Sequence, residues 1–208
     1  MASEPHRHIS RQLLDLALPL IGLNVLNVLA LTVDTAMLAH IPDAEVTLIG
    51  LGFSTQILFL LMVAMSGLTV GTVALIARAH GAGQGDRVNH ILAQSVQLTV
   101  ALSAIVAVGG SLLAEPLLRL LGAGPQSVEA GLTYMLILLP GVVFSYLNIL
   151  LAAALRGVGN TRLPFVVALS MNLLNAGLNY GLILGNYGLP ALGIQGAAIG
   201  TLIAQAAA

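Results

Sequence analysis

One carboxylate lies deep within an apolar stretch near the start of the chain. Asp34 is the only ionisable residue well inside the apolar segment 13–39. Asn27 lies seven residues earlier and so shares its helical face. Ionisable groups inside long apolar helices are costly and are functional candidates by default. A carboxylate in such a place can bind a cation and can exchange that cation for a proton.

A second set of polar residues follows a helical spacing. Asn172, Asn175 and Asn179 stand at i, i+3 and i+7 in the apolar segment 163–185. Three amides on one face of an apolar helix need polar partners. They predict either interhelical hydrogen bonds or the lining of a wet cavity, and amides in membrane helices serve both purposes.

The depth of these residues links the two sets. Asp34 lies six residues before His40, and Asn179 lies six residues before Gly185. At the rise of an α-helix, each side chain is about 9 Å below the same end of its helix. Tyr134 and Thr201 lie a few residues inside the corresponding ends of the apolar segments 130–155 and 193–208. If these four faces converge, the four groups line one cavity.

Composition places these residues in a membrane. Of the 208 residues, 58% are hydrophobic and 7% are charged, whereas a soluble domain has about 25% charged residues. A crossing helix needs about 20 apolar residues. The net charge of −1 and the lack of a basic run exclude a nucleic-acid binder. The expected fold is an all-α integral membrane bundle of six helices, at about 13–39, 48–77, 91–113, 130–155, 163–185 and 193–208.

Three local patterns shape the expected bundle. Pro19 lacks a backbone N–H and is expected to bend the first helix. Gly67 and Gly71 form a small-xxx-small pair, which predicts close helix packing. The sequence as a whole shows no residues at the spacing of metal ligands and no group of residues that could form a catalytic site. We therefore expect that the protein is not an enzyme and holds no resident metal.

The arginines predict the orientation. With the N-terminus inside, six of the seven arginines fall on the cytoplasmic side, which follows the positive-inside rule. Residues 1–12 are then a cytoplasmic tail, and residues 13–208 form the transmembrane unit. The last segment is about 24 Å long and short of a crossing. We therefore expect a truncation in the sixth helix, with the unit being half of a transporter built from two repeats.

These residues and their order resemble the N-terminal lobe of the multidrug and toxic compound extrusion (MATE) transporters. The Val-Asp-Thr-Ala run is most similar to the bacterial DNA-damage-inducible branch. The resemblance covers nearly the whole chain and is carried by residues 18–19 (Leu-Pro), 33–36, 77–83, 155–164, 172–175, 179–180 and 192–201.

The resemblance implies a twelve-helix antiporter in the cell membrane that exports organic cations, drugs or toxic metabolites in exchange for H⁺ or Na⁺. Asp34 would take the coupling cation, with a bound Na⁺ also contacting Asn175 and Asn179. The other members of the cavity network would be Asn27, Tyr134, Asn172 and Thr201. Some relatives carry an Asp at the position of Asn179, which here cannot release a proton.

The resemblance also implies the partners and leaves alternatives. Membrane lipids, a small organic cation and a C-terminal lobe of the same chain would be the partners, with no cofactor besides the coupling ion. One alternative is a lipid-linked oligosaccharide or polysaccharide flippase of the same superfamily. Another is a membrane protein without a transport function.

Overall fold

The computed structural model describes residues 4–41 and 43–208, and the side chains of residues 1–16, 19, 20 and 27 lie outside the description. The described chain is helical throughout, apart from short connections. The helices are α1 (Glu4–Leu38), α2 (Ala44–Gly81), α3 (Gly85–Leu120), α4 (Pro125–Leu138), the 3₁₀ turn η1 (Leu139–Gly141), α5 (Val142–Gly157), α6 (Arg162–Leu184) and α7 (Ile194–Ala207).

Five helical segments of the described chain are long and apolar enough to cross a membrane. They are the apolar part of α1, then α2, α3, the α4–α5 pair and α6, and α7 is a shorter apolar helix. Each of the six apolar segments of the sequence is therefore helical, and the predicted all-α membrane fold is confirmed.

The helices extend beyond the apolar segments that predicted them. α1 begins at Glu4 rather than at residue 13, and α3 spans Gly85–Leu120 rather than 91–113. Hydropathy marks the part of a helix that fits the hydrocarbon layer. Backbone hydrogen bonds continue past that layer as long as the flanking residues can adopt helical dihedrals.

The fourth predicted segment is two helices instead of one. Leu139–Gly141 forms a 3₁₀ turn between α4 and α5. Pro140 has no N–H to donate and its ring crowds the preceding turn, which disfavours a regular α-helix at this point. The Pro-Gly pair in the sequence indicated a break here, but the hydropathy is high on both sides of it, so the segment was predicted as one helix.

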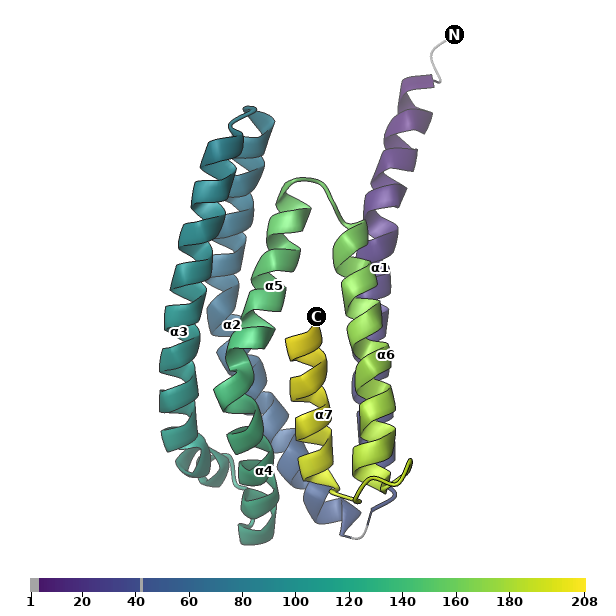
Figure 1. The fold of residues 1–208 in the computed structure, drawn as a ribbon, viewed down its shortest axis with the longest axis vertical. Helices are drawn as coiled ribbons and strands as arrows, with labels where there is room; N and C mark the ends of the chain where they lie inside the picture. The colour runs from purple at the N-terminus through teal and green to yellow at the C-terminus, as the bar shows by residue number, and fades with distance from the viewer. Residues whose placement is uncertain (1–3, 42) are drawn as a thin grey trace.

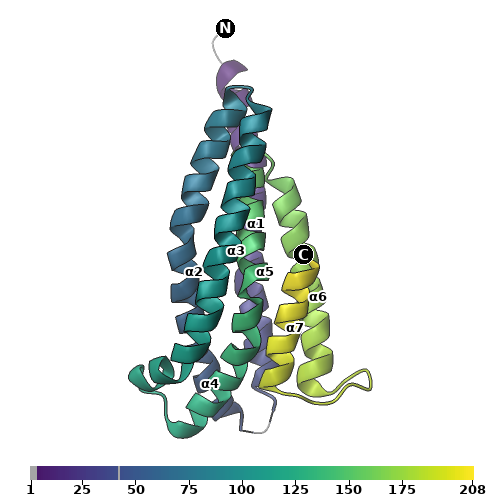
Figure 2. The same ribbon diagram turned by 60° about the vertical axis from the view of Figure 1, so that its left-hand side comes forward.

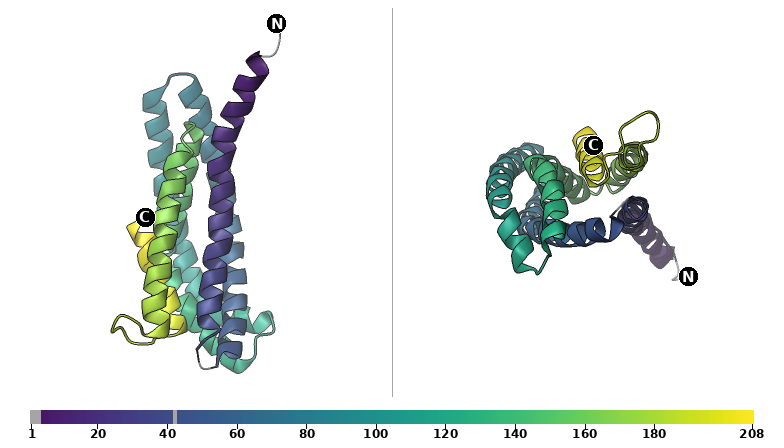
Figure 3. Two further views of the ribbon diagram at one scale, coloured as in Figure 1. Left: turned by 90° about the vertical axis from the view of Figure 1, so that its right-hand side faces the viewer. Right: turned by 90° about the horizontal axis from the view of Figure 1, so that it is seen from below.

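Figure 1 shows the arrangement of the helices. α2 and α3 form a long hairpin on one side, α1 and α6 run side by side on the other, and α4–α5 lie between. α7 packs against α6 and α4, as the turned view in Figure 2 also shows. The α1–α2, α3–α4 and α6–α7 connections lie at one end of the bundle, opposite the N-terminus (Figure 3). We call this end the α6–α7 end.

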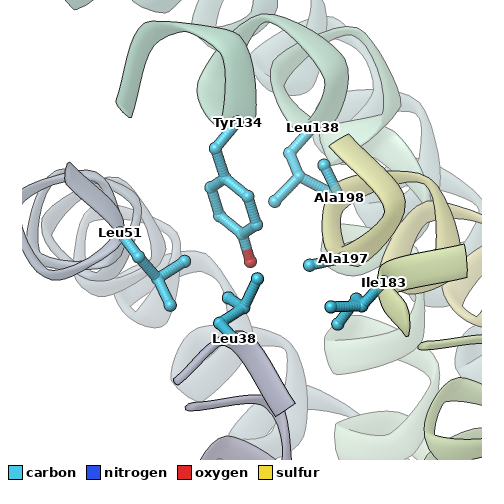
Figure 4. Close-up of a cluster of buried hydrophobic side chains, with 7 residues drawn as sticks. All are labelled: Leu38, Leu51, Tyr134, Leu138, Ile183, Ala197 and Ala198. Atoms are coloured by element: carbon cyan, nitrogen blue, oxygen red, sulfur yellow. The ribbon is translucent and has the colours of Figure 1, made fainter. Parts of the chain in front are cut away.

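A hydrophobic cluster lies near the α6–α7 end, where five helices meet. Figure 4 shows the Tyr134 ring of α4 pointing into it, toward Leu38 at the end of α1. The members are Leu38, Leu51, Tyr134, Leu138, Ile183, Ala197 and Ala198. Asp34 lies one turn before Leu38 on α1, so the cluster fixes the helix that carries the carboxylate.

The predicted close packing at Gly67 and Gly71 does not occur among the described residues. A Cβ added to either glycine would have no heavy atom within 4 Å. Both glycines instead line an open groove beside α3, together with Leu98. The glycine pair permits close approach of another helix, but the sequence motif does not specify which surface approaches.

Candidate functional site

The carboxylate of α1 is hydrogen-bonded to an amide of α6. Asn179 is fully buried, with 0% of its surface exposed, and its Nδ2 donates to Asp34 Oδ1 over 2.7 Å. Asp34 itself is half-buried. A hydrogen bond from a neutral amide to a carboxylate is charge-assisted and stronger than a neutral pair. The two helices are therefore joined by a polar contact at the predicted position.

The contact continues across α6 to α7. Asn179 Nδ2 also lies 3.3 Å from Asn175 Oδ1 and donates to it. Asn175 Nδ2 in turn donates to Thr201 Oγ1 over 3.2 Å. The result is one hydrogen-bonded chain from Asp34 through Asn179 and Asn175 to Thr201. We call these four residues the polar network.

Tyr134 adds a fourth element to this region. Its side chain is buried and lines the same cavity as Thr201. The ring packs in the hydrophobic cluster of Figure 4, which orients the hydroxyl toward the interior of the bundle. The convergence predicted from helix depth thus occurs, with contributions from α1, α4, α6 and α7.

Close packing of α6 and α7 brings the amides to Thr201. Gly196 and Gly200 are buried on the α7 face toward α6, and a Cβ at Gly196 would overlap the backbone of Leu182. The Leu192 N–H donates to the Leu182 carbonyl over 2.8 Å, which fastens the start of α7 to the end of α6. Small residues at such contacts allow helix backbones to approach closely.

Asn172, a predicted member of the network, bonds elsewhere, and the predictions for Asn27 and Pro19 are not tested. The Asn172 Nδ2 donates to the carbonyl of Ala168 in its own helix, over 2.8 Å. An amide side chain can donate to a backbone carbonyl of the preceding turn in this way. Asn172 therefore lies on the same face of α6 as the other two amides without bonding to them. The side chains of Asn27 and Pro19 lie outside the described residues, so the predicted bend at Pro19 remains a prediction.

A second polar cluster was missed from the sequence. Ser145 Oγ of α5 donates to Gln205 Oε1 of α7 over 2.6 Å. Asn148 Nδ2, one turn further along α5, donates to the carbonyl of Gln205 over 2.8 Å. The i, i+3 spacing of Ser145 and Asn148 in an apolar segment was the available signal. Their partner could not be identified before α5 and α7 were known to be neighbours.

Two cavities adjoin these polar groups. A cavity of about 280 Å³ is lined by Tyr134 and Thr201, by Ser145 and Gln205, and by apolar side chains that include Phe59 and Met62. A larger cavity of about 520 Å³ lies between α1, α5 and α6, and Asn24, Asn148 and Arg156 are its polar lining. The smaller cavity shares two residues with the region around Asp34.

The arrangement suits the binding and release of a small cation. A carboxylate, two amide oxygens and a hydroxyl are hard oxygen ligands, and the carboxylate can carry a proton instead. In the structure the N–H group of Asn179 faces Asp34, because the carboxylate can only accept a hydrogen bond. An Na⁺ that used the Asn179 oxygen as a ligand would need that amide to turn.

A family model, MatE, matches residues 19–181. The chain is 31% identical over 198 residues to "Probable multidrug resistance protein NorM" of Thermotoga maritima, which covers 95% of this chain and 42% of the relative. It is 29% identical over 187 residues to "Multidrug resistance protein PmpM" of Pseudomonas aeruginosa, with 89% and 39% covered.

Solved structures show the same fold. A structure of the "MATE multidrug transporter DinF-BH" superposes with a TM-score of 0.87 at 24% identity, over 95% of this chain and 43% of that chain. "Crystal structure of MATE in the bent conformation" gives 0.84 at 23% identity, over 95% and 43%. The chain spans less than half the length of these relatives, and its helices correspond to one lobe. This multi-pass membrane protein belongs to the MATE transporter family.

Proposed function

We propose that this chain forms one lobe of a secondary active antiporter that exports organic cations, including drugs or toxic metabolites, in exchange for H⁺ or Na⁺. The observation that carries the proposal is the Asp34 carboxylate, hydrogen-bonded to Asn179 inside a bundle of apolar helices. Family membership and the multidrug-resistance relatives support it. Transport by the whole protein would also need the second lobe.

Exchange requires that the two cations exclude each other. Tyr134 and Thr201 line the cavity of about 280 Å³, and Thr201 also belongs to the polar network that includes Asp34. A cationic substrate in this cavity is attracted by the ionised carboxylate. A proton or Na⁺ on Asp34 neutralises that attraction and favours release. If the protein alternates between outward-facing and inward-facing states with only one of the two cations bound at a time, the two are exchanged across the membrane.

The lining of this cavity favours a cationic over an anionic cargo. The described residues that line it include no Lys or Arg, and they include the aromatic rings of Phe59, Tyr134 and Tyr146 and the thioether of Met62. A lipid-linked oligosaccharide carries phosphate and would need basic partners. We therefore place the flippase second. The N-terminus is proposed to be cytoplasmic, with Arg78, Arg87, Arg156 and Arg162 on the inner side.

The test uses the full reading frame that encodes this chain. Efflux of a fluorescent organic cation is measured in cells under an imposed pH gradient and then under an imposed Na⁺ gradient. The wild type should follow one gradient, and Asp34→Asn should lose gradient-driven efflux. Asp43→Asn makes the same chemical change at an exposed loop position and should keep efflux. Unchanged efflux in Asp34→Asn would show that the coupling role is wrong.

A further inference from the structure

One oxygen of the polar network has no hydrogen-bond partner among the described residues. It is Asn179 Oδ1, which is fully buried. The Nδ2 of the same amide contacts two acceptors, Asp34 Oδ1 and Asn175 Oδ1, and an amide nitrogen has two N–H donors. The donor side of Asn179 is thus fully used while its acceptor side faces a different surface.

That surface is the backbone of α7 at Gly200. A Cβ added to Gly200 would overlap Asn179 Oδ1 and would lie 3.2 Å from Asn179 Cγ. The carbonyl oxygen therefore occupies the space that any side chain at position 200 would take. With the amide reversed, its oxygen would face the oxygens of Asp34 and Asn175, and its N–H groups would be buried against α7.

We propose that Gly200 is a positioning residue for the coupling site. Because Gly200 has no side chain, the Asn179 oxygen can lie against α7, and the Asn179 N–H then points toward Asp34. The inference rests on the proposed function, in which Asp34 binds the coupling cation. Gly200 itself contacts neither the cation nor the substrate. It acts through the orientation of one amide.

Gly196, one turn earlier on α7, separates this role from helix packing. A Cβ at Gly196 would overlap the backbone of Leu182, which cannot move without shifting α6. A Cβ at Gly200 would overlap the end of a side chain, and its next contact is Leu178 Cβ at an ordinary 3.4 Å. Gly196 sets the spacing of α6 and α7, whereas Gly200 sets the position of Asn179.

The experiment compares Gly200→Ala with Gly177→Ala in the full-length protein. Gly177 lies on α6 and has no heavy atom within 4 Å of an added Cβ. Infrared spectra of the purified protein identify the Asp34 carboxylate band by its loss in Asp34→Asn. Gly200→Ala should shift this band and lower gradient-driven efflux about tenfold, the effect of losing one hydrogen bond to a charged group. Gly177→Ala should do neither.

A double variant tests whether Gly200 acts through Asn179. In Asn179→Ala the oxygen is absent, so adding Gly200→Ala should cause no further loss of efflux. If Gly200→Ala accumulates poorly in the membrane, Asn179→Ala should restore its accumulation, because the space for the Cβ is then free. Independent, multiplying losses in the double variant, or a folding defect that persists in it, would overturn the proposal.

The two proposals fail in different ways. Unchanged gradient-driven efflux in Asp34→Asn would refute the coupling role, while a band shift in Gly200→Ala would still support the positioning of Asn179. Loss of efflux in Asp34→Asn, combined with wild-type efflux and an unshifted band in Gly200→Ala, would refute the role of Gly200 alone.

Discussion

Two regions of the bundle bury polar side chains, and they do so differently. Between α2 and α3, the Thr72 hydroxyl donates to the Leu68 carbonyl of its own helix over 2.8 Å and accepts from the Ser95 hydroxyl over 2.9 Å. In the polar network, Asn179 depends on α1 for one hydrogen bond and on its own helix for the other. We call the first region, with the buried hydroxyls of Thr69, Thr72, Ser95 and Thr99, the α2–α3 seam.

The difference lies in charge and in where the partners come from. Hydroxyls of the α2–α3 seam are neutral, and several bond to the preceding turn of their own helix, as Thr69 does to Met65 O over 3.2 Å. The hydroxyls that bond in this way stay satisfied when the neighbouring helix moves. The polar network holds a carboxylate, and its bond to Asn179 exists only while α1 and α6 are in register. Burial of polar groups alone therefore does not mark a transport site.

The largest expected effect comes from removing the central amide. Asn179→Ala takes away the hydrogen bond to Asp34 and the link to Asn175 together, so gradient-driven efflux should fall by more than about tenfold. Efflux of a fluorescent cation by the full-length protein measures this. Asn172→Ala is the matched control, because Asn172 bonds only within α6 among the described contacts. Equal losses in both variants would show that the network has no special role.

A smaller effect is expected at the far end of the network. Thr201→Val keeps the shape of the side chain but removes the hydroxyl that accepts from Asn175. Because Asp34 keeps its bond to Asn179, efflux should fall only a few-fold, consistent with the loss of about 1 kcal/mol. Thr201→Ser, which retains the hydroxyl, should transport at close to the wild-type rate. A complete loss in Thr201→Val would place the cation nearer to Thr201 than we propose.

The smallest effect is expected in the α2–α3 seam. Thr99 Oγ1 is buried without a hydrogen-bond partner in the described part of the chain. Replacing it in Thr99→Val removes an unsatisfied hydroxyl while keeping the volume, so stability should stay equal or rise by up to about 1 kcal/mol. Thermal unfolding in detergent measures stability, and efflux should be unchanged. A marked loss of efflux would contradict the separation of the two regions.

The sequence predicted the polar network because helix geometry is regular. A constant rise along each helix placed Asp34, Asn179, Tyr134 and Thr201 at one depth, and the structure brings these residues together. Composition and segment length predicted the all-α membrane fold because a helix needs about 20 apolar residues to cross the hydrocarbon layer. Resemblance to the MATE family added the expected role of Asp34, which stays a proposal.

Other features depend on contacts that periodicity does not encode. Asn172 shares a face with Asn175 and bonds to its own helix instead. Gly67 and Gly71 fit a packing motif but face an open groove. The partner of Ser145 on α7 became visible only once α5 and α7 were placed side by side. In each case the neighbouring surface, rather than the local sequence, decides what the residue does.

The central claim is that substrate and coupling cation exclude each other at Asp34, and it can be measured without a gradient. Purified full-length protein in weakly buffered detergent is mixed with the organic cation, and proton release is followed with a pH indicator, with Na⁺ displacement followed in parallel. The wild type should release H⁺ or Na⁺ on binding, and Asp34→Asn should release neither. Release of the same size from Asp34→Asn would contradict the account.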